Sequence, residues 1–401
     1  MKIMQISTTL SGGAGIAARR LNSALVEIGI DSNIVGISNK NISTYGHESI
    51  LQRNGFQRSK SKINTVLQAR FLQRGHEPMT TISVESLVRK HEMFEQADII
   101  HIHATYNLIN EKGFREILNS EKKIFITMHD CRLFTGGCHY PLECKLFEAS
   151  CNRCPKAKVP FQRLVEKAFR ERSMTFSQIQ NINLISPSIW LAEEAKKSKV
   201  LNNRRVEVIR NPIPNIFLIA NRALNRKKFG FNSNHVVVAF VAGDLENPNK
   251  GLDTLVKALK IMLISEKHFK LLLVGKNLKK SQVVGLDYVA YETSSDSDLA
   301  DLLSAADVLV VPSVIDNSPN VIGEAIMCGL SVIGARTGGI TEVMNEMDFP
   351  TFEVNDVPGL AIELENFRVE YDRESIKNKA ISRVGNKIVA SQMVKLYGFN
   401  S

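Results

Sequence analysis

Residues 307–342 read DVLVVPSVIDNSPNVIGEAIMCGLSVIGARTGGITE, and this stretch decides the fold class. Val308–Pro312 is an apolar, β-branched run of the kind that is buried in a parallel sheet. Ser313–Ser318 is a polar loop at the carboxyl end of that strand, and a second short strand is expected at Ser331–Ala335. Two such strands with a helix between them are typical of an α/β fold.

The segment between the two strands carries the signals of a helix. Pro319 suits the first helical position because its missing N–H costs nothing there, and Asn317 or Ser318 can cap the helix. Gly329 is placed to end it in a left-handed conformation, and the glycine pair at 338–339 turns into a further helix. Ligands of open α/β sheets bind at such strand ends, and a helix amino terminus favours phosphate. The stretch therefore predicts a cradle for a nucleotide phosphate.

The rest of the chain repeats this alternation of short strands and helices, which predicts doubly wound parallel sheets. The first series of expected strands is Lys2–Thr8, Asn33–Ile37, Asp98–His103, Lys123–Met128, Asn181–Ser186 and Arg205–Ile209. Pro212 and Pro214 interrupt the pattern, and a second series begins with Val236–Ala242 and Lys270–Gly275.

Two Rossmann-like domains that face a central cleft are therefore expected. The first spans residues 1–213 and the second spans residues 214–384. A final helix at about 385–401 is expected to pack back on the first domain.

Composition and charge narrow the class of protein. Among the 401 residues no apolar run approaches the ~20 residues of a membrane-spanning helix, so a soluble, cytoplasmic protein is expected. The net charge of +10 favours an anionic partner. Two basic stretches, Arg53–Arg74 and Lys156–Arg172, contain apolar residues at near-helical spacing. They fit either a peripheral position on the inner face of an anionic membrane or two ordinary solvated helix faces. Nucleic acid is not expected, because no recognition motif accompanies the charge.

Two acids dominate the opening stretch. Asp316 lies in the loop and Glu324 lies eight residues later in the helix, with Asn320 one turn before it on the same face. A carboxylate on that face can accept hydrogen bonds from both hydroxyls of a ribose, and one in the loop can hold sugar hydroxyls. An ordinary surface helix is the alternative. Near the start of the chain, the turn at Gly12 and Gly13 lets a ligand approach the backbone closely.

The residues from Pro312 to Glu342 resemble the donor-binding signature of retaining glycosyltransferases of family 4, which have the two-domain GT-B fold. The matching positions are Asp316, Glu324-Ala325, Gly329, Gly338-Gly339 and Glu342. The form DNSPNVIGEA is most similar to the branch that includes colanic-acid and O-antigen biosynthesis enzymes. Further matches follow in order along the chain: SGGAG at 11–15, MHDCRLFTGGCHY at 128–140, SPSIWLAEEAKKS at 186–198, VIRNPIP at 208–214 and NPNKGLDTL at 247–255.

The resemblance implies roles for individual residues in holding a nucleotide-sugar. Glu324 would bind the ribose, Asp316 the transferred sugar, and Lys250 the diphosphate. A lysine together with a helix amino terminus stabilises the negative charge that grows as the glycosidic bond breaks. The other implied donor-binding residues are Gly12, Gly13, Asn317, Asn320 and Val321.

The resemblance also implies a catalytic group in the first domain. His129 would face the donor sugar and the acceptor, orienting a hydroxyl or stabilising the transition state, and Asp130 would assist. The family's usual arginine before the diphosphate lysine is replaced by Asp244, so Arg336 or Arg210 is the candidate substitute. No cofactor is required for catalysis.

The cysteines form a separate motif. Cys138, Cys144, Cys151 and Cys154 lie within 17 residues and end in a C-x-x-C. In a cytoplasmic protein four such thiolates favour a structural zinc site, whereas free thiols or disulfides are the alternative.

Taken together, the resemblance implies a retaining hexosyltransferase that uses a UDP- or GDP-sugar. Its acceptor would be a saccharide or a polyprenyl-diphosphate-linked sugar in surface polysaccharide biosynthesis. The alternatives are a sugar-nucleotide epimerase with the same architecture and a non-catalytic nucleotide-sugar-binding accessory protein.

Overall fold

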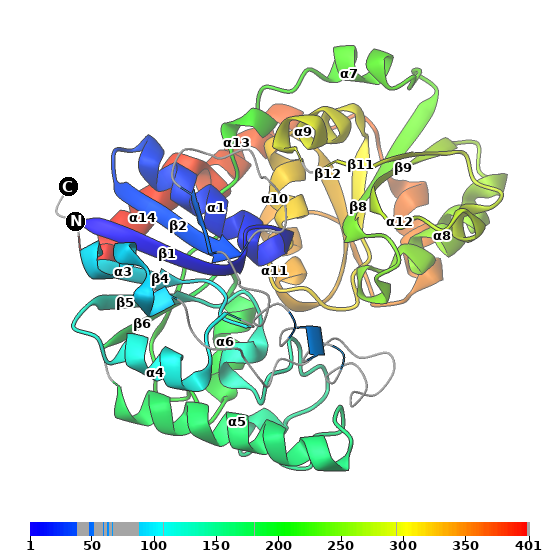
Figure 1. Cartoon of the computed structure of the whole chain (residues 1–401). Helices are drawn as coiled ribbons and strands as arrows, with labels where there is room; N and C mark the ends of the chain where they lie inside the picture. Colours follow the sequence, from blue (N-terminus) through cyan, green and yellow to red (C-terminus); the bar gives the residue numbers. More distant parts are fainter. Residues whose placement is uncertain are drawn as a thin grey trace. The chain divides into compact units, whose positions relative to one another are not determined.

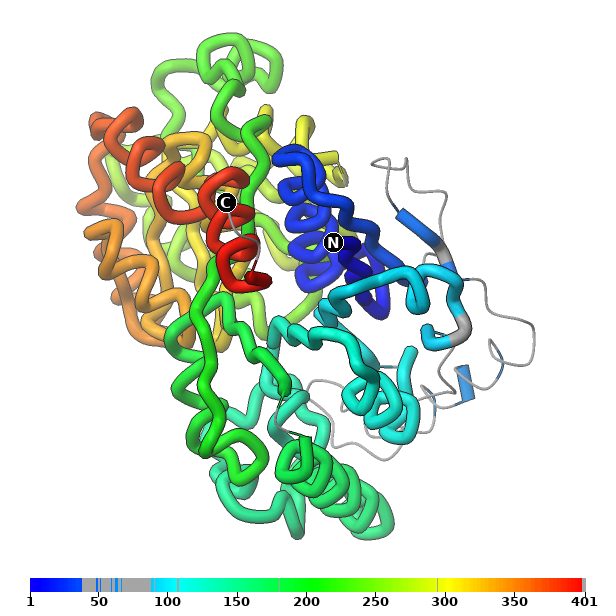
Figure 2. The backbone as a smooth tube through the Cα atoms, turned by 90° about the vertical axis from the view of Figure 1, so that its left-hand side faces the viewer, coloured from blue at the N-terminus to red at the C-terminus, as the bar shows by residue number. Residues whose placement is uncertain are grey.

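The computed structural model describes residues 1–37, 48–51, 88–106, 108–179, 181–293 and 295–398, together with positions 59, 62, 63 and 66. These residues form two compact units, each built on a parallel sheet (Figure 1). Unit 1 comprises residues 1–210 and 390–401, and unit 2 comprises residues 211–389. Both ends of the chain therefore belong to unit 1 (Figure 2).

Unit 1 has a seven-stranded sheet in the order β3-β2-β1-β4-β5-β6-β7. All neighbouring strands are parallel. The strands are β1 (Lys2–Thr9), β2 (Asp31–Ile37), β3 (Glu48–Ile50), β4 (Ile99–Ile102), β5 (Lys123–Thr127), β6 (Ile182–Ser186) and β7 (Val206–Val208). The helices are α1 (Gly12–Glu27), α3 (Glu92–Gln96), α4 (Glu111–Leu118), α5 (Val159–Gln178), α6 (Ile189–Lys197) and the last turns of α14 (Asn386–Tyr397). Single 3-10 turns occur at η1 (Val88–Lys90), η2 (Cys131–Phe134) and η3 (Leu146–Glu148).

The two faces of this sheet differ in chemistry. Successive residues of a strand point to opposite faces. Met4, Ile100 and Ile124 and their neighbours two residues on join the apolar core under α5. The alternate positions include Gln5 and His101, which are fully buried, and this second face is covered by α1 and α14. Unit 1 therefore contains a layer of buried polar side chains beside its apolar core.

Unit 2 has a six-stranded parallel sheet in the order β10-β9-β8-β11-β12-β13. The strands are β8 (His235–Asp244), β9 (His268–Lys276), β10 (Tyr288–Tyr291), β11 (Val308–Val311), β12 (Ser331–Ala335) and β13 (Thr351–Phe352). The helices are α7 (Arg222–Lys228), α8 (Leu252–Ile261), α9 (Asp296–Ala305), α10 (Asn320–Met327), α11 (Gly338–Met347), α12 (Val357–Asn366) and α13 (Arg373–Val384). The 3-10 turns are η4 (Asn215–Phe217), η5 (Pro248–Lys250), η6 (Met262–Ile264) and η7 (Lys280–Val283).

Unit 2 carries an apolar core on each face of its sheet. Val237, Leu309 and Val332 face one core with α9, α10, α11 and α13, while Val238 and Val310 face the other with α8 and α12. Both faces are covered, which explains why these strands are apolar without alternation. The prediction of two doubly wound parallel sheets is confirmed.

Three strands were not predicted, and all three lie at sheet edges. They are β3, β10 and β13, whose sequences are ESI, YVAY and TF. An edge strand is short and half exposed, so it lacks the buried apolar run by which the central strands were recognised. The predicted cap of the opening helix was also wrong. Pro319 itself is the N-cap residue of α10, and it provides no side-chain cap.

The basic stretches are placed only in part. Most of Arg53–Arg74 lies outside the described residues. In the stretch Lys156–Arg172, most of which lies in α5, Phe161, Val165 and Phe169 point into the core of unit 1, whereas Val159 and Leu164 are exposed. Among the helices that the structure describes, none is at once long and apolar enough to span a bilayer.

Asp307 joins α7 to the sheet of unit 2. Its carboxylate is fully buried and accepts from Arg222 at 2.6 Å and from Arg226 at 2.9 Å. The backbone N–H of Val237 in β8 also donates to it at 2.7 Å. A buried charge is tolerated only when it is paired in this way, so the network fixes how α7 meets the strands.

We expect Asp307→Ala to destabilise the protein by about 3–5 kcal/mol, because two arginines lose their shared buried partner. Urea unfolding followed by far-ultraviolet circular dichroism measures the loss. The control is Glu246→Ala, which removes an exposed ion pair with Lys279 at 2.9 Å and should cost less than about 1 kcal/mol. Equal losses for both variants would contradict the assignment.

Candidate functional site

The candidate residues lie where strand order reverses in each sheet. The reversal falls between β1 and β4 in unit 1 and between β8 and β11 in unit 2. Lys250 and Asp316 follow β8 and β11, whereas Gly12 and His129 follow β1 and β5. Crevices at these strand ends are where open α/β sheets bind ligands. Each unit therefore has its own set of candidate residues at its strand ends.

In unit 2, the turn after β8 packs directly on the backbone that leaves β11. Gly251 has φ +75°, and a Cβ there would lie 2.0 Å from the carbonyl oxygen of Pro312. The N–H of Val314 donates to the carbonyl of Asn249 at 2.9 Å. Only glycine fits at this position, and its close packing brings Lys250 to the end of β11.

A second glycine turn packs against the same loop from β12. Gly338 has φ +51°, and a Cβ there would lie 2.1 Å from the carbonyl oxygen of Asp316. The N–H of Gly339 donates to that oxygen at 3.0 Å, and the Thr337 hydroxyl donates to the carbonyl of Val314 at 3.0 Å. The loop from Pro312 to Asp316 is thus held from both sides.

The two predicted donor ligands meet in this loop. Lys250 Nζ donates to Asp316 Oδ2 at 2.6 Å, and their side chains are 34% and 12% exposed. The remaining exposure leaves the ammonium reachable by a ligand. The pair therefore offers one cation and one carboxylate at the carboxyl ends of β8 and β11. A cation can bind a phosphate, and a carboxylate can accept from sugar hydroxyls.

The helix α10 carries the second predicted acid of unit 2, Glu324. Glu324 is 5% exposed, and it follows Asn320 by one turn. The Asn320 side-chain carbonyl accepts from the Asn211 amide at 3.0 Å, which fixes the start of the helix. Gly329 ends the helix region with φ +71°, as predicted. The absence of a side-chain cap at Pro319 suits a helix start that binds an anion.

In unit 1, the glycine turn after β1 divides into two parts. Gly12 has φ +74°, and no described residue other than its neighbours in the chain lies within 4 Å of a Cβ added at Gly12 or Gly13. Gly15 is different, because a Cβ there would lie 2.3 Å from the carbonyl oxygen of Thr9. Gly15 allows α1 to pack on β1, whereas the first two glycines leave the turn open.

His129 is half-buried and contacts a chain of buried side chains that the sequence analysis missed. His129 Nε2 lies 3.1 Å from His103 Nδ1, and His103 Nε2 lies 2.8 Å from Gln5 Oε1. His101 stacks on His103 with ring centres 4.2 Å apart and contacts the Tyr397 hydroxyl at 2.6 Å. The signal was the period-two pattern in HIH, which places both histidines on the face opposite the isoleucines.

This chain sets the protonation of His129. The Gln5 amide donates to Asn22 and to Ser32, so its oxygen is the atom that faces His103. His103 therefore carries its proton on Nε2 and accepts on Nδ1 from His129 Nε2. In neutral His129 the nitrogen without a proton is consequently Nδ1.

Burial keeps these histidines neutral. It lowers the pKa of His129 to about 4, and nearby Asp130 partly opposes this. Burial lowers the pKa of His101 to about 3 and that of His103 well below its usual value. Unit 1 therefore presents an uncharged imidazole at the end of β5. It can form hydrogen bonds but carries no charge.

Asp130 is committed to the loop that follows His129. Its carboxylate accepts from the Arg132 backbone at 2.9 Å and from the Arg132 guanidinium, which lies over the ring of Tyr106. Although burial opposes ionisation, the Arg132 charge holds the pKa of Asp130 at about 2. These contacts give Asp130 a positioning role beside His129.

The two substitute phosphate ligands are engaged elsewhere. Arg336 follows β12 in unit 2, where it pairs with Glu353 at 2.9 Å and donates to the Thr351 hydroxyl at 3.0 Å. Arg210 lies in unit 1 and donates to the carbonyl of Pro187 at 3.1 Å.

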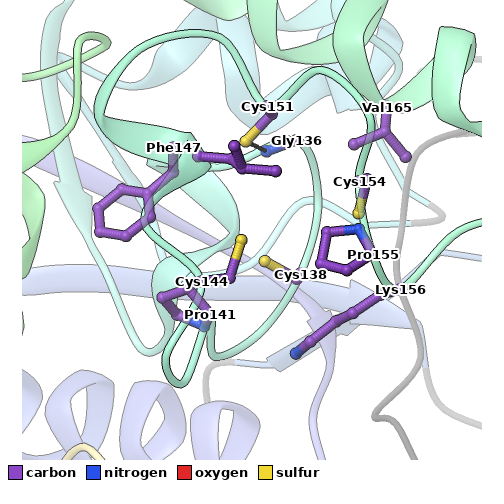
Figure 3. A pocket seen from close by; sticks show the side chains of 11 residues that line it. Gly136, Cys138, Pro141, Cys144, Phe147, Cys151, Cys154, Pro155, Lys156 and Val165 are labelled. Carbon is purple, nitrogen blue, oxygen red and sulfur yellow. Dashed lines mark hydrogen bonds between the residues drawn. The ribbon is translucent and has the colours of Figure 1, made fainter.

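The four predicted zinc ligands gather around one cavity of unit 1 (Figure 3). As the side chains stand, no group of three or more histidine, cysteine, aspartate or glutamate residues in the described part of the chain is arranged to hold a metal ion. All six cysteines are free thiols.

Comparison with known proteins adds to this geometry. The sequence model of the family described as "Glycosyl transferases group 1" matches residues 236–367, which contain Lys250, Asp316 and Glu324. A sucrose-phosphate synthase from Thermosynechococcus elongatus has a TM-score of 0.67 at 17% identity over 99% of this chain and 98% of that chain. The chain has the GT-B fold. Anabaena HepE, crystallised with UDP-glucose, shares this GT-B arrangement with a TM-score of 0.63 at 13% identity over 99% of each chain.

One curated relative also matches. It is the GDP-mannose-dependent monoacylated alpha-(1-6)-phosphatidylinositol monomannoside mannosyltransferase of Corynebacterium glutamicum. The two sequences are 25% identical over 188 residues, which cover 43% of this GT-B chain and 47% of the relative. The match therefore spans about half of that relative's length.

The neutral histidines predict acid sensitivity of unit 1. Each has a folded pKa below its unfolded value near 6.5, so the unfolded chain binds more protons as the pH falls. Stability should therefore fall between about pH 6.5 and pH 4, by up to about 1.4 kcal/mol per pH unit for each histidine. Trp190, the single tryptophan, lies in unit 1 and reports its unfolding by fluorescence.

His101→Gln should reduce the slope of the unfolding free energy against pH by the equivalent of about one proton. The glutamine amide can still contact the hydroxyls of Tyr397 and Thr127, but it does not titrate. The exposed His268→Gln serves as the control and should leave the slope unchanged. If His101→Gln and the wild type had equal slopes, the imidazole of His101 would bind its proton in the folded state as readily as in the unfolded state, and the prediction would be wrong.

Proposed function

We propose that the chain is a retaining glycosyltransferase that moves a hexose from a UDP- or GDP-sugar to a saccharide or lipid-linked acceptor of surface polysaccharide synthesis. The observation that carries the proposal is the contact of Lys250 with Asp316, which lies, as Glu324 does, inside the segment that matches the glycosyltransferase family. The names of the relatives support a nucleotide-sugar donor. One is GDP-mannose-dependent, and another was crystallised with UDP-glucose.

In this proposal unit 2 binds the donor. Glu324 accepts from the ribose hydroxyls, Asp316 holds the sugar, and Lys250 balances the diphosphate. The start of α10 at Asn320 and Val321 adds N–H groups and the positive end of the helix dipole. Asn317, which is 2% exposed, lines the same loop. Stabilising the departing diphosphate lowers the barrier because that is where negative charge accumulates.

In unit 1, the proposal gives His129 a hydrogen-bonding role. An imidazole with a pKa of about 4 carries no charge near neutral pH, which suits a group that orients a sugar hydroxyl. The leaving phosphate then takes the acceptor's proton, so no protein nucleophile is needed. The open turn at Gly12 and Gly13 leaves room for a ligand close to the backbone.

Asp244 occupies the position at which the glycosyltransferase family that this sequence resembles has a second phosphate-binding cation. Its carboxylate accepts from the N–H of Glu246 at 3.0 Å and shapes the turn after β8. Of the two arginine candidates, Arg336 shares unit 2 with Lys250 and follows β12, which pairs with β11, the strand before Asp316. We therefore assign the second diphosphate contact to Arg336. On donor binding its guanidinium leaves Glu353 and binds the phosphate.

Donor binding is tested by thermal shift with a panel of UDP- and GDP-sugars, because a ligand that binds only the folded state raises the melting temperature. We expect one donor class to stabilise the wild type. Glu324→Gln should weaken its affinity by about 10–100-fold, since charged hydrogen bonds to two hydroxyls are lost. Lys250→Met should lower kcat by about 10²–10³-fold through lost charge stabilisation.

Matched controls are Glu266→Gln and Lys257→Met, which change exposed side chains of the same unit. Both should bind and turn over the donor as the wild type does. If Glu324→Gln kept full affinity and activity, the assigned ribose contact would be wrong.

Transfer itself is tested with the stabilising donor and oligosaccharide or polyprenyl-diphosphate-linked acceptors. Proton magnetic resonance of the new glycosidic bond should show the anomeric configuration of the donor. Inversion would contradict the retaining mechanism. Epimerised donor in the absence of acceptor, or binding without turnover on every acceptor, would replace the proposal with one of its two rivals.

A further inference from the structure

The connection between β5 and α5 contains a four-thiol cavity. Cys138, Cys144, Cys151 and Cys154 all line it, together with the Lys156 side chain (Figure 3). Its volume of about 20 Å³ accommodates about one water-sized species.

The backbone of this connection is held in costly conformations. Six described residues other than glycine have positive φ, and three of them are Asn or Asp, which tolerate it. The other three are Leu142, Cys151 and Arg153, with φ of 55°, 51° and 48°, and all lie in this connection. Such conformations persist only where other interactions impose them. In its described residues the connection contains two 3-10 turns and a single β-bridge residue, Ala157, so little regular structure is present to supply those interactions.

The surroundings of the cavity suit negatively charged sulfur. The N–H of Gly136 donates to Cys151 Sγ at 3.3 Å. Lys156 is 7% exposed, its ammonium donates to the carbonyl of Tyr140 at 2.6 Å, and it makes no ion pair with any described residue. A buried cation normally has an anionic partner. Among the described residues that line the cavity there is no carboxylate, so within this lining the thiols, once ionised, are the groups that can supply that charge.

We propose that this cavity is a structural zinc site whose ligands are Cys138, Cys144, Cys151 and Cys154. Zinc prefers four thiolates in a tetrahedral arrangement. Each Zn–S bond replaces an S–H bond whose proton passes to solvent, so the filled site carries a net charge of −2. Lys156 offsets one of these charges, and the Gly136 N–H donates to a ligand sulfur, as outer groups of thiolate sites do.

We expect rotation of the cysteine side chains to produce that arrangement. The thiols surround the cavity, but no three of them yet point to one centre. Each cysteine has a single side-chain torsion with three staggered positions, so a sulfur can turn inward without a change of backbone. Disulfide formation is the competing outcome. It would consume the same thiols in pairs, require an oxidant and leave Lys156 without a negative partner.

The site would stabilise the segment that carries His129. Cys131 N–H donates to the carbonyl of His139 at 2.8 Å, and His139 Nδ1 lies 3.8 Å from Asp130. Thr135 accepts from the Gly137 N–H at 3.2 Å and donates to the carbonyl of Cys138 at 3.0 Å. Fixing the thiol loop therefore fixes both ends of the turn that follows β5.

The full chain, expressed in zinc-supplemented medium and purified without chelator, tests the site. Mass spectrometry of the metal content should give about one zinc per chain. Cys151→Ser and Cys154→Ser should each lose most of it, while Cys328→Ala, in unit 2, keeps it. Because variants can fail to fold, the wild type is also loaded with cobalt. Intense visible bands of tetrahedral cobalt with thiolate charge transfer are expected.

Lys156 gives a second test. Lys156→Met should weaken zinc affinity by about 10–100-fold in competition with a chromophoric chelator. Lys145→Met changes an exposed lysine of the same connection and should leave the affinity unchanged. Sub-stoichiometric zinc without a cobalt–thiolate spectrum, or two disulfides in the denatured wild type, would overturn the proposal. None of these readouts depends on glycosyl transfer.

Discussion

The contact of two glycine turns with one loop determines the geometry of unit 2. The loop from Pro312 to Asp316 leaves β11 with its carbonyls against Gly251 and Gly338. Glycine is needed at both positions for two reasons. Each has a positive φ, and any side chain there would overlap a backbone oxygen. Lys250, Asp316 and the start of α10 are positioned by this packing. The double glycine of the motif is therefore a packing requirement as well as a possible ligand contact.

Unit 1 solves a different physical problem. One face of its sheet buries Gln5, His101 and His103 instead of aliphatic side chains. Buried polar atoms are tolerated because each finds a partner, and the resulting chain of hydrogen bonds leaves little freedom in the orientation of His129. The apolar face under α5 supplies the burial that this polar face does not. Orientation of the histidine and stability of the sheet are thus carried by opposite faces.

Much of the fold could be predicted because central parallel strands have a strong signal. The stretch Ser331–Ala335 was predicted with its observed bounds, and the end of α10 at Gly329 followed from glycine chemistry. The edge strands were missed because they lack buried runs. The pair formed by Lys250 and Asp316 joins residues 66 apart, so the resemblance suggested it but local pattern could not.

The polar layer of unit 1 was missed for another reason. His101 and His103 were read as the end of an apolar strand, although their alternation with isoleucine was visible. Their partners Gln5 and Tyr397 lie 98 and 296 residues away from His103 and His101, and no periodicity connects such distances. Lys156 was likewise counted as surface charge until its burial beside the thiols was known. Side chains whose role depends on distant partners are those that sequence patterns describe least.

The division of unit 1 into two segments of chain has a consequence for synthesis. Tyr397 is 1% exposed, contacts His101 and stacks edge-on against Phe125, yet residues 211–389 of unit 2 are synthesised before it. Unit 2 is continuous in sequence, so it can finish folding first as the chain emerges. Unit 1 begins earlier, but His101 acquires its tyrosine partner only after unit 2 has been made. The earlier-started unit is therefore the last to be completed on the ribosome.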